Sequence, residues 1–346
     1  MIRIAVDGMG GDNAPGCMID GAAEALKKSE EIEIFLVGRK EVLEPALVEK
    51  GVSDSRLHVV PASEVIETAE KPTEAIRNKK DSSMVVGLKM VKSGDADCFV
   101  SCGSTGALLV GGQVLAGRLK GVRRSPLATL IPTVAGRSLL LDCGANVDAR
   151  ATDLVQFARM GSIYMEHVVG VKNPTVGIVN IGAEEEKGNA LVKETFPLLK
   201  ACTDINFVGS VEARDIPMGG VDVMLCEAFV GNVVLKMYEG TAMALFSVMK
   251  KSILSSARGK IGGMLIRPAL HDMRHHFSSD EYGGAPMLGL KGLVVKAHGN
   301  STGREVCTAI LQCIAFSKAD IAGKIEASIG AAQKAEAGGN RTADSN

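Results

Sequence analysis

Aromatic side chains and an excess of charge are both missing from this chain. Its 346 residues include no Trp, three Tyr and nine Phe, and 39 basic residues are balanced by 40 acidic ones. Nucleic-acid binders usually carry a strong basic excess and stack bases on aromatic side chains. The composition therefore argues against a nucleic-acid partner and predicts a core of aliphatic side chains.

Long apolar segments are missing as well. No run approaches the ~20 apolar residues that a membrane-spanning helix needs, and the N-terminal residues, with one Arg and no long apolar stretch, do not resemble a signal peptide. The eight cysteines include no C-x-x-C pair with a matching His cluster, which argues against zinc. Most lie in strand-like apolar runs, where a free Cys behaves as a small hydrophobe. We therefore expect a cytoplasmic protein in a reducing compartment.

Standard nucleotide-binding loops are the third absence. Gly8 and Gly10 are followed by Asn13 at the position where a dinucleotide fingerprint needs its third glycine. The P-loop sequence occurs nowhere in the chain. The motifs therefore predict no nucleotide cofactor.

Apolar runs alternate with helix-length segments along most of the chain, which is typical of a doubly wound, mostly parallel α/β sheet. The length allows one large α/β unit or two lobes that share a cleft. We expect a single domain over residues 1–328 and a frayed tail at 329–346, because the tail has no apolar face. Strands are expected at 2–6, 32–37, 57–60, 98–101, 138–141, 176–180, 221–226 and 292–296. Helices are expected at 14–28, 81–92, 105–118, 152–167, 184–199 and 230–250.

The first strand runs directly into a loop of carboxylates and glycines. This loop contains Asp7, Gly10, Gly11 and Asp12, and ligands in open α/β sheets bind at the carboxyl ends of the strands. The loop is either a tight strand-to-helix turn or part of a ligand site. The two carboxylates could orient a lysine or bind a metal. Because two carboxylates without a third are poor evidence for Mg²⁺, we expect no metal.

Five further strands end in polar turns that contain glycine. If their carboxyl ends lie at one edge of one sheet, these turns form a shared site. Helices that open at Ser104, Asn232 and Ser301 would point N–H groups into that site, which suits an anion such as phosphate. The five turns are 101–106, 142–146, 180–184, 227–232 and 298–303.

Several motifs, in order, resemble the phosphate acyltransferase family of the PlsX type. The resemblance extends from residue 1 to about 325. Two motifs depart from the family pattern, since Gly103-Ser-Thr-Gly106 and Cys226-Glu-Ala-Phe229 stand where the family has Gly-Asn-Thr-Gly and Cys-Asp-Gly-Phe. The matching motifs are Met9-Gly-Gly-Asp-Asn-Ala-Pro15, Ala62-Ser-Glu-Val-Ile66, Lys79-Lys-Asp-Ser-Ser83, Leu141-Asp-Cys-Gly-Ala-Asn146, Phe229-Val-Gly-Asn-Val-Val-Leu-Lys236, Tyr282-Gly-Gly-Ala-Pro286 and His298-Gly299.

The resemblance implies an enzyme that converts acyl-acyl-carrier-protein and inorganic phosphate into acyl phosphate and free carrier protein. Such enzymes feed bacterial phospholipid synthesis, are dimeric, and share the fold of isocitrate and isopropylmalate dehydrogenases and of phosphotransacetylase. The implied partners are the acyl carrier protein, phosphate, a second copy of the chain, the inner face of the cell membrane and the downstream glycerol-3-phosphate acyltransferase. No cofactor is implied.

This reaction needs a bound phosphate nucleophile and a group that stabilises the oxyanion. It needs no covalent enzyme intermediate. Our phosphate-binding candidates are Ser104, Thr105, Gly231, Asn232 and Ser301, and our cationic candidates are Lys187 and Lys236. Lys236 lies one helical turn after Asn232 and so on the same face.

The remaining catalytic candidates each have a structural alternative. His298 could donate a proton to the leaving sulfur or cap its turn, and Asn146 could act in catalysis or serve the turn that contains it. Lys187 could equally be a solvated lysine at the start of a helix. A cysteine nucleophile is the rival mechanism, but buried and inert cysteines are favoured at 102, 143 and 226 because apolar runs precede them.

Two surface segments suggest partners. In a helical hairpin at about 235–275, Ile261, Met264, Leu265 and Ile266 are flanked by cations, so this tip could contact an anionic bilayer or pack in a dimer. A basic run could steer the acidic carrier or be a solvated loop; its arginines are Arg118, Arg123 and Arg124.

Three other functions remain open on this sequence. One is a phosphotransacetylase-like enzyme that acts on short acyl-CoA, and another is a nicotinamide-dependent oxidative decarboxylase. The third is a non-catalytic scaffold that binds the acyl carrier at the membrane. Phosphate-dependent thiol release without metal or nucleotide would distinguish the acyltransferases from the other two.

Overall fold

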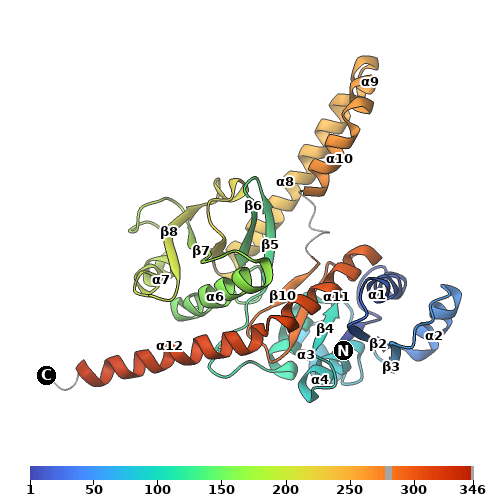
Figure 1. Ribbon diagram of the computed structural model, residues 1–346, viewed down its shortest axis with the longest axis horizontal. Helices are drawn as coiled ribbons and strands as arrows, with labels where there is room; N and C mark the ends of the chain where they lie inside the picture. The colour runs from blue at the N-terminus through green and yellow to red at the C-terminus, as the bar shows by residue number, and fades with distance from the viewer. Residues whose placement is uncertain (277–282, 344–346) are drawn as a thin grey trace.

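The chain folds around two mostly parallel sheets, as a computed structural model that describes residues 1–276 and 283–343 shows (Figure 1). The first sheet has the strand order β10-β11-β4-β1-β2-β3, and the second has the order β5-β6-β9-β7-β8. The first contains β1 (Ile2–Asp7), β2 (Ile32–Gly38), β3 (Leu57–Pro61), β4 (Cys98–Ser101), β10 (Ala285–Met287) and β11 (Leu293–Lys296). The second contains β5 (Ala128–Thr133), β6 (Gly136–Leu141), β7 (Thr175–Asn180), β8 (Asn206–Glu212) and β9 (Val223–Leu225).

The α/β class is confirmed, but the expectation of one shared sheet edge is wrong. The polar turns after β4 and β11 belong to the first sheet, whereas those after β6, β7 and β9 belong to the second. Buried parallel strands read as similar apolar runs whichever sheet holds them. The assignment of strands to two sheets is therefore a tertiary property.

Helices cover both faces of each sheet because successive strand residues point to opposite faces. In β1, Ile4 and Val6 pack on the core under α1 and α11, whereas Ala5 packs on the core under α4. Each sheet with its helices forms a lobe, and in the second lobe α6 and α7 cover one face while α8 (Ala228–Leu254) leaves from the other. The first-lobe helices are α1 (Gly16–Lys28), α2 (Lys40–Glu49), α3 (Pro72–Asn78), α4 (Ser83–Ser93), α5 (Thr105–Gly111) and α11 (Gly303–Lys318). The second-lobe helices are α6 (Ala151–Tyr164) and α7 (Ala190–Lys200). A π-helical turn at Gly112–Ala116 continues α5 in the first lobe, and short π- and 3₁₀-helical turns lie at Met165–Val169 and Ile216–Met218 in the second.

The two sheets adjoin at their antiparallel edge strands. β5 pairs with β6 and β10 pairs with β11, both antiparallel, and a bridge between Leu127 and Met287 links the two edges. Sequence patterning predicted neither β5 nor β10, and it also missed β8. β10 has only three residues and contains Pro286, which is tolerated because this strand lies at a sheet edge.

Helix α12 (Ile321–Ala343) extends through the segment from residue 329 where the sequence predicts a frayed tail. Ile321, Ile325 and Ile329 are buried at successive helical turns and pack on the main core. This short apolar stripe anchors the helix, which then continues past residue 328 beneath the second lobe (Figure 1). The expected boundary at 328 therefore falls inside a helix.

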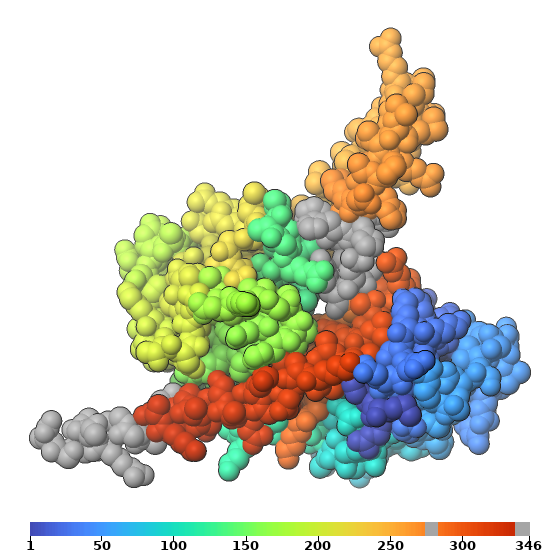
Figure 2. Space-filling view, viewed as in Figure 1, coloured from blue at the N-terminus to red at the C-terminus, as the bar shows by residue number. Residues whose placement is uncertain are grey.

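A long helical arm projects from the body of the molecule (Figures 1 and 2). It consists of α8 (Ala228–Leu254), α9 (Ala257–Leu265) and α10 (Arg267–His276). Only Ala228 and Gly231 of α8 are buried. The arm lies where the sequence predicted a helical hairpin, and its root is fixed by the close packing of Gly231.

We expect Gly231→Ala to destabilise the protein, because its Cβ would lie 1.9 Å from the carbonyl oxygen of Asp142. Overpacking costs 1–3 kcal/mol, and we expect about 3 kcal/mol in urea unfolding here. Gly240→Ala is the matched control on the same helix, since a Cβ there meets nothing within 4 Å. It should be neutral or stabilise by up to about 1 kcal/mol. Equal effects of the two changes would contradict the packing argument.

Candidate active site

Three loops at the carboxyl end of the first sheet form one connected structure. They follow β1, β4 and β11, which are neighbours in the sheet. The Asp12 N–H donates to the Gly299 carbonyl over 2.7 Å, and the Asn13 side chain donates to the Ser301 carbonyl over 3.2 Å. The predicted N-terminal loop thus lies against the turns that contain Ser104 and Ser301.

Glycine is required in the first loop because other backbone lies so close. A Cβ on Gly10 would lie 2.4 Å from an Asp7 carboxylate oxygen and 2.8 Å from the Gly103 nitrogen. Gly11 has φ of +101°, and its Cβ would lie 2.8 Å from the Cys102 Cβ. These two glycines therefore let the loops meet, which is a structural role in the site.

The buried Asp7 carboxylate links the first loop to the end of β4. It accepts hydrogen bonds from Ser101 Oγ over 2.7 Å and from the Met9 N–H over 3.2 Å. Burial raises the pKa of Asp7, and these hydrogen bonds oppose that rise. Asp12, by contrast, is exposed. Within residues 1–276 and 283–343, no three His, Cys, Asp or Glu side chains gather in a metal-binding group.

The hydroxyl candidates occupy two helix starts. Ser104 is buried as the N-cap of α5 and accepts a hydrogen bond from the Ala107 N–H, and Thr105 follows it exposed. Ser301 is buried beside the first loop. His298 is exposed, and its Nδ1 accepts a 3.5 Å hydrogen bond from the Asn300 N–H. That contact matches the turn-capping alternative for His298.

Asp142 organises the corresponding edge of the second sheet. Its carboxylate is buried and accepts five hydrogen bonds of 2.7–3.1 Å, from Leu127 N, Gly144 N, Ala145 N, Asn146 N and Asn146 Nδ2. Asn146 is 1% exposed and also donates to the Ser125 carbonyl over 3.0 Å. Its amide group therefore holds the turn, as the structural alternative predicted for it.

The first turn of α8 uses its own N–H groups. Glu227 accepts hydrogen bonds from the Phe229 and Val230 N–H groups, and the Gly231 N–H donates to the Glu227 carbonyl over 3.0 Å. The Gly231 amide is therefore already engaged within α8, and the phosphate-binding role predicted for Gly231 stays a prediction. Asn232, one residue later, is exposed.

Lys236 and Lys296 are cationic side chains from different lobes, and the charge of Lys236 acts on Lys296. Lys236 on α8 is exposed and forms a 2.8 Å ion pair with Glu239. Lys296 ends β11 and is half-buried, and its Nζ donates to the Cys102 carbonyl over 3.3 Å. Burial lowers the pKa of Lys296, and the nearby charge of Lys236 lowers it further. Sequence reasoning missed Lys296, although a lysine that ends a wholly apolar strand was a usable signal.

Lys187 lies on a separate loop after β7. It is exposed, and its 2.8 Å contact with Glu184 raises its pKa. The Asn180 side chain donates to the Lys187 carbonyl and orders this loop. No contact between the described residues joins the Lys187 ammonium to the other candidates. Tyr282, which opens one of the sequence motifs, lies outside the described residues.

Known proteins resemble this chain along almost its whole length. A family model described as "Fatty acid synthesis protein" matches residues 2–324. A phosphate acyltransferase of Clostridium botulinum (strain ATCC 19397 / Type A) is 49% identical over 327 residues, which cover 94% of this chain and 97% of the relative. The chain belongs to the phosphate acyltransferase family. A phosphate acyltransferase of Caldicellulosiruptor bescii is 46% identical over 315 residues, or 91% of this chain and 94% of that protein.

Solved structures confirm the fold that the resemblance implied. A phosphotransacetylase from Streptococcus pyogenes matches with a TM-score of 0.62 at 16% identity, covering 91% of this chain and 94% of the other. A branched-chain phosphotransacylase from Enterococcus faecalis V583 matches with a TM-score of 0.57 at 15% identity, covering 91% and 98%. This phosphate acyltransferase thus shares their α/β fold, and the family match confirms the predicted acyltransferase activity.

The cysteines near the strand ends of this acyltransferase are buried thiols. Burial raises the pKa of Cys102 and Cys143 to about 12 and the pKa of Cys226 well above its ordinary value. A thiol with so high a pKa supplies almost no thiolate at neutral pH. The inert interpretation made from the sequence is therefore favoured over a cysteine nucleophile.

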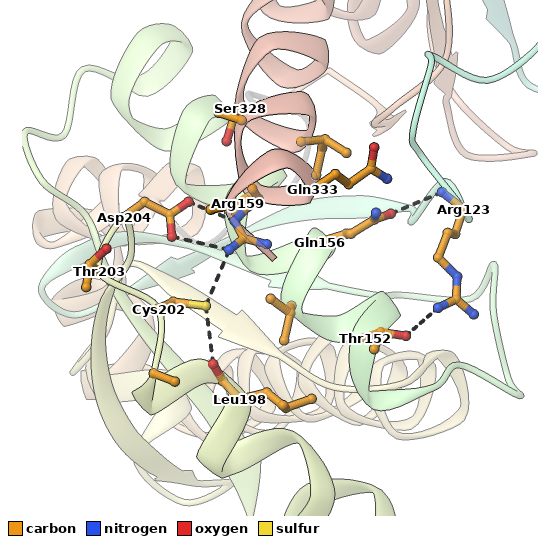
Figure 3. A pocket seen from close by; sticks show the side chains of 16 residues that line it. Arg123, Thr152, Gln156, Arg159, Leu198, Cys202, Thr203, Asp204, Ser328 and Gln333 are labelled. Carbon is orange, nitrogen blue, oxygen red and sulfur yellow. Dashed lines mark hydrogen bonds and ion pairs between the residues drawn. The ribbon is translucent and has the colours of Figure 1, made fainter. Parts of the chain in front are cut away.

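The arginines of the predicted carrier patch pair within the chain. Arg123 lies 3.3 Å from the buried Asp153 carboxylate and 2.6 Å from the Thr152 hydroxyl, and Arg124 lies 2.9 Å from Asp148. Arg118 donates to the Arg123 carbonyl. Figure 3 shows Arg123 at one end of a cavity of about 1100 Å³ between α6, the end of α7 and α12. The patch is therefore less positive than its sequence suggests.

Single alanine variants test the cysteine mechanism at Cys102, Cys143 and Cys226. We expect each variant to release thiol from the acyl substrate at a rate within about fivefold of that of the parent enzyme. The reason is that burial raises the pKa of each of these thiols and so disfavours the nucleophilic thiolate. The measurement is initial-rate kinetics at pH 7.5, alongside maleimide labelling of the native protein. A loss of a thousandfold in a folded variant would restore the cysteine mechanism.

Proposed function

We propose that this acyltransferase transfers the acyl group of a long-chain acyl-acyl-carrier-protein to inorganic phosphate, for phospholipid synthesis. The observation that carries the proposal is the meeting of three strand-end loops around Lys296, on which the charge of Lys236 in the other lobe also acts. Hydroxyls and an ammonium group at these loops suit a phosphate ion. The named relatives are phosphate acyltransferases, which supports the same chemistry.

In the proposed reaction, a phosphate oxygen attacks the thioester carbonyl carbon. The new C–O bond forms, the C–S bond breaks, and the leaving thiolate takes a proton. Ser104, Thr105, Ser301, Asn232 and Lys236 hold the phosphate in this proposal. Because phosphate at neutral pH is already nucleophilic, the protein contributes positioning and charge stabilisation rather than a covalent intermediate.

Lys187 and His298 are the candidates for the oxyanion and the leaving sulfur. Both are exposed, and Lys187 must exchange its contact with Glu184 for the substrate. An exposed ion pair of this kind contributes little, so this exchange costs little. We propose that Asn146 contributes to catalysis only indirectly, because its side chain holds the turn after β6 in place.

We propose that the acidic carrier protein lands on Arg118, Arg123 and Arg124. Asp148, the partner of Arg124, is 79% exposed, so a carrier carboxylate can replace it. Exposed pairs contribute about 0.2–1 kcal/mol, which makes such an exchange nearly neutral. The basic run then mainly raises the rate at which the carrier protein and the enzyme associate.

We propose that the arm mediates contact with the inner face of the cell membrane and with a second copy of the chain. Its tip exposes Ile261, Met264, Leu265 and Ile266, at 46–78% of their surface. Burying one methylene is worth roughly 0.8 kcal/mol, so a long acyl phosphate released into water would cost on the order of 10 kcal/mol. Release at the bilayer avoids that cost and delivers the product to the downstream glycerol-3-phosphate acyltransferase.

Among the described residues, no single helix has both the length and the apolar character needed to cross a bilayer. Helix α11 and the part of α12 up to Ala335, which meet at a 52° bend, satisfy that criterion only as a pair.

The decisive test of the reaction is thiol release from long-chain acyl-carrier-protein with and without inorganic phosphate, in the absence of metal and nucleotide. We expect release only when phosphate is present, and slower release from acyl-CoA. Lys236→Met should lower kcat/KM at least tenfold, because a charge-assisted contact to phosphate is lost. Lys250→Met, further along the same helix, is the control. Binding of the carrier without any release would favour a scaffold instead.

Membrane contact can be separated from dimer packing at the tip of the arm. We expect Leu265→Glu to weaken binding to anionic lipid vesicles at least tenfold, since burying a Leu contributes about 1.5–3 kcal/mol. Val48→Glu is the control, because Val48 is an exposed apolar residue on α2, which is not part of the arm. Vesicle co-sedimentation and size-exclusion chromatography read out the two roles. Unchanged vesicle binding with loss of the dimer would assign the tip to dimer packing.

A further inference from the structure

Lys296 is a cation held by carbonyl oxygens alone. It follows the buried residues Leu293, Val294 and Val295 at the end of β11. Its Nζ donates to the Cys102 carbonyl over 3.3 Å and to the Ala297 carbonyl. An ammonium group has three N–H donors, so one donor is left over. In the part of the chain that the structure describes, no carboxylate lies within ion-pair distance of this ammonium.

Asp7 and Asp12 act on Lys296 only at longer range. The Asp7 carboxylate already accepts hydrogen bonds from Ser101 and Met9, and burial raises its pKa. Asp12 is exposed to solvent. A half-buried cation without a close counter-ion is costly, because burial removes hydration that no partner replaces. A bound anion would supply the close counter-charge that Lys296 lacks among the described residues.

Lys236 lies on α8, which belongs to the second lobe. Its charge acts on Lys296, and like charges brought together repel each other. Lys296 itself lies at the turn that leads to Ser104, because its Nζ donates to the Cys102 carbonyl over 3.3 Å, and an anion bound there would supply the missing counter-charge. Inorganic phosphate has the charge and the several acceptor oxygens that both ammonium groups require.

We propose that Lys296 is the second cation of the phosphate site, and that its free N–H binds a phosphate oxygen while Lys236 binds another. The inference rests on the proposed function, which supplies phosphate as the nucleophile. Lys296 touches the reacting phosphate and so acts directly in catalysis. The carbonyls of Cys102 and Ala297 fix its position, so that phosphate meets an ammonium already in place.

The test compares Lys296→Gln, Lys296→Arg and Lys291→Gln in the full-length enzyme. The Gln side chain can still donate to the Cys102 carbonyl but removes the charge, and Arg keeps the charge. Lys291 is an exposed lysine just before the same strand and serves as control. Initial rates give kcat and the KM values for phosphate and for acyl-carrier-protein. Thermal unfolding with increasing inorganic phosphate, without acyl substrate, measures phosphate binding separately.

We expect Lys296→Gln to raise the KM for phosphate at least tenfold, to change the KM for acyl-carrier-protein less than threefold, and to lose the phosphate-dependent rise in Tm. Lys296→Arg should recover part of both effects, and Lys291→Gln should match the parent. A phosphate KM within threefold of the parent for Lys296→Gln would overturn the inference. If Lys296→Gln does not fold, Lys296→Met takes its place beside Lys296→Arg. The inference is overturned if both of these variants keep the parent's phosphate KM and the parent's phosphate-dependent rise in Tm.

The proposed function can fail independently of this inference. If the parent enzyme releases no thiol with phosphate, the proposed reaction is wrong. The thermal experiment then still decides whether Lys296 binds phosphate: a Tm rise lost in Lys296→Gln supports the anion site, and a Tm rise that this variant retains contradicts it.

Discussion

The buried carboxylate of Asp142 is the interaction on which the second lobe and the arm depend. It gathers backbone N–H groups from the start of β5 and from the turn after β6. The same turn receives the Ala228 N–H at the Asn146 carbonyl, and Gly231 packs directly on the Asp142 backbone. The direction in which α8 leaves the body is thereby fixed. Lys236 and the apolar tip both take their positions from that direction.

The first lobe uses the same physical device with different residues. Asp7 ends β1 as Asp142 follows β6, and each buried carboxylate accepts hydrogen bonds both from its own turn and from a residue at a neighbouring strand, from Ser101 for Asp7 and from Leu127 for Asp142. Buried polar groups must be paired, so such a carboxylate selects one loop conformation. These two turns, one at each sheet, set the surroundings of Lys296 in the first lobe and the start of α8, which carries Lys236, in the second.

The polar groups at the strand ends fall into two classes. Some use their hydrogen-bonding groups within the chain and hold a turn, and others keep a donor for a ligand. Asn146, the Gly231 amide and Asp7 are engaged by neighbouring groups and hold turns in place. Lys296 and Asn232 retain capacity for a ligand, since one lysine donor is left over and Asn232 is exposed. The arginines of the basic run fall between these cases, because their partner Asp148 is exposed but Asp153 is buried.

The sequence by itself determined the α/β class, most strands and the positions of the polar turns, because apolar runs and Gly-containing turns are local properties of the chain. It also determined the family, through motifs spread over most of its length. Only the tertiary structure decided that the strands form two sheets, since strands buried on both faces look alike in sequence. Tertiary contacts also anchored α12 through Ile321 and its neighbours, engaged the Asn146 amide, paired Arg123 and left Lys296 with a spare donor. Each of these depends on partners distant in sequence, and no local pattern reports which donor meets which acceptor.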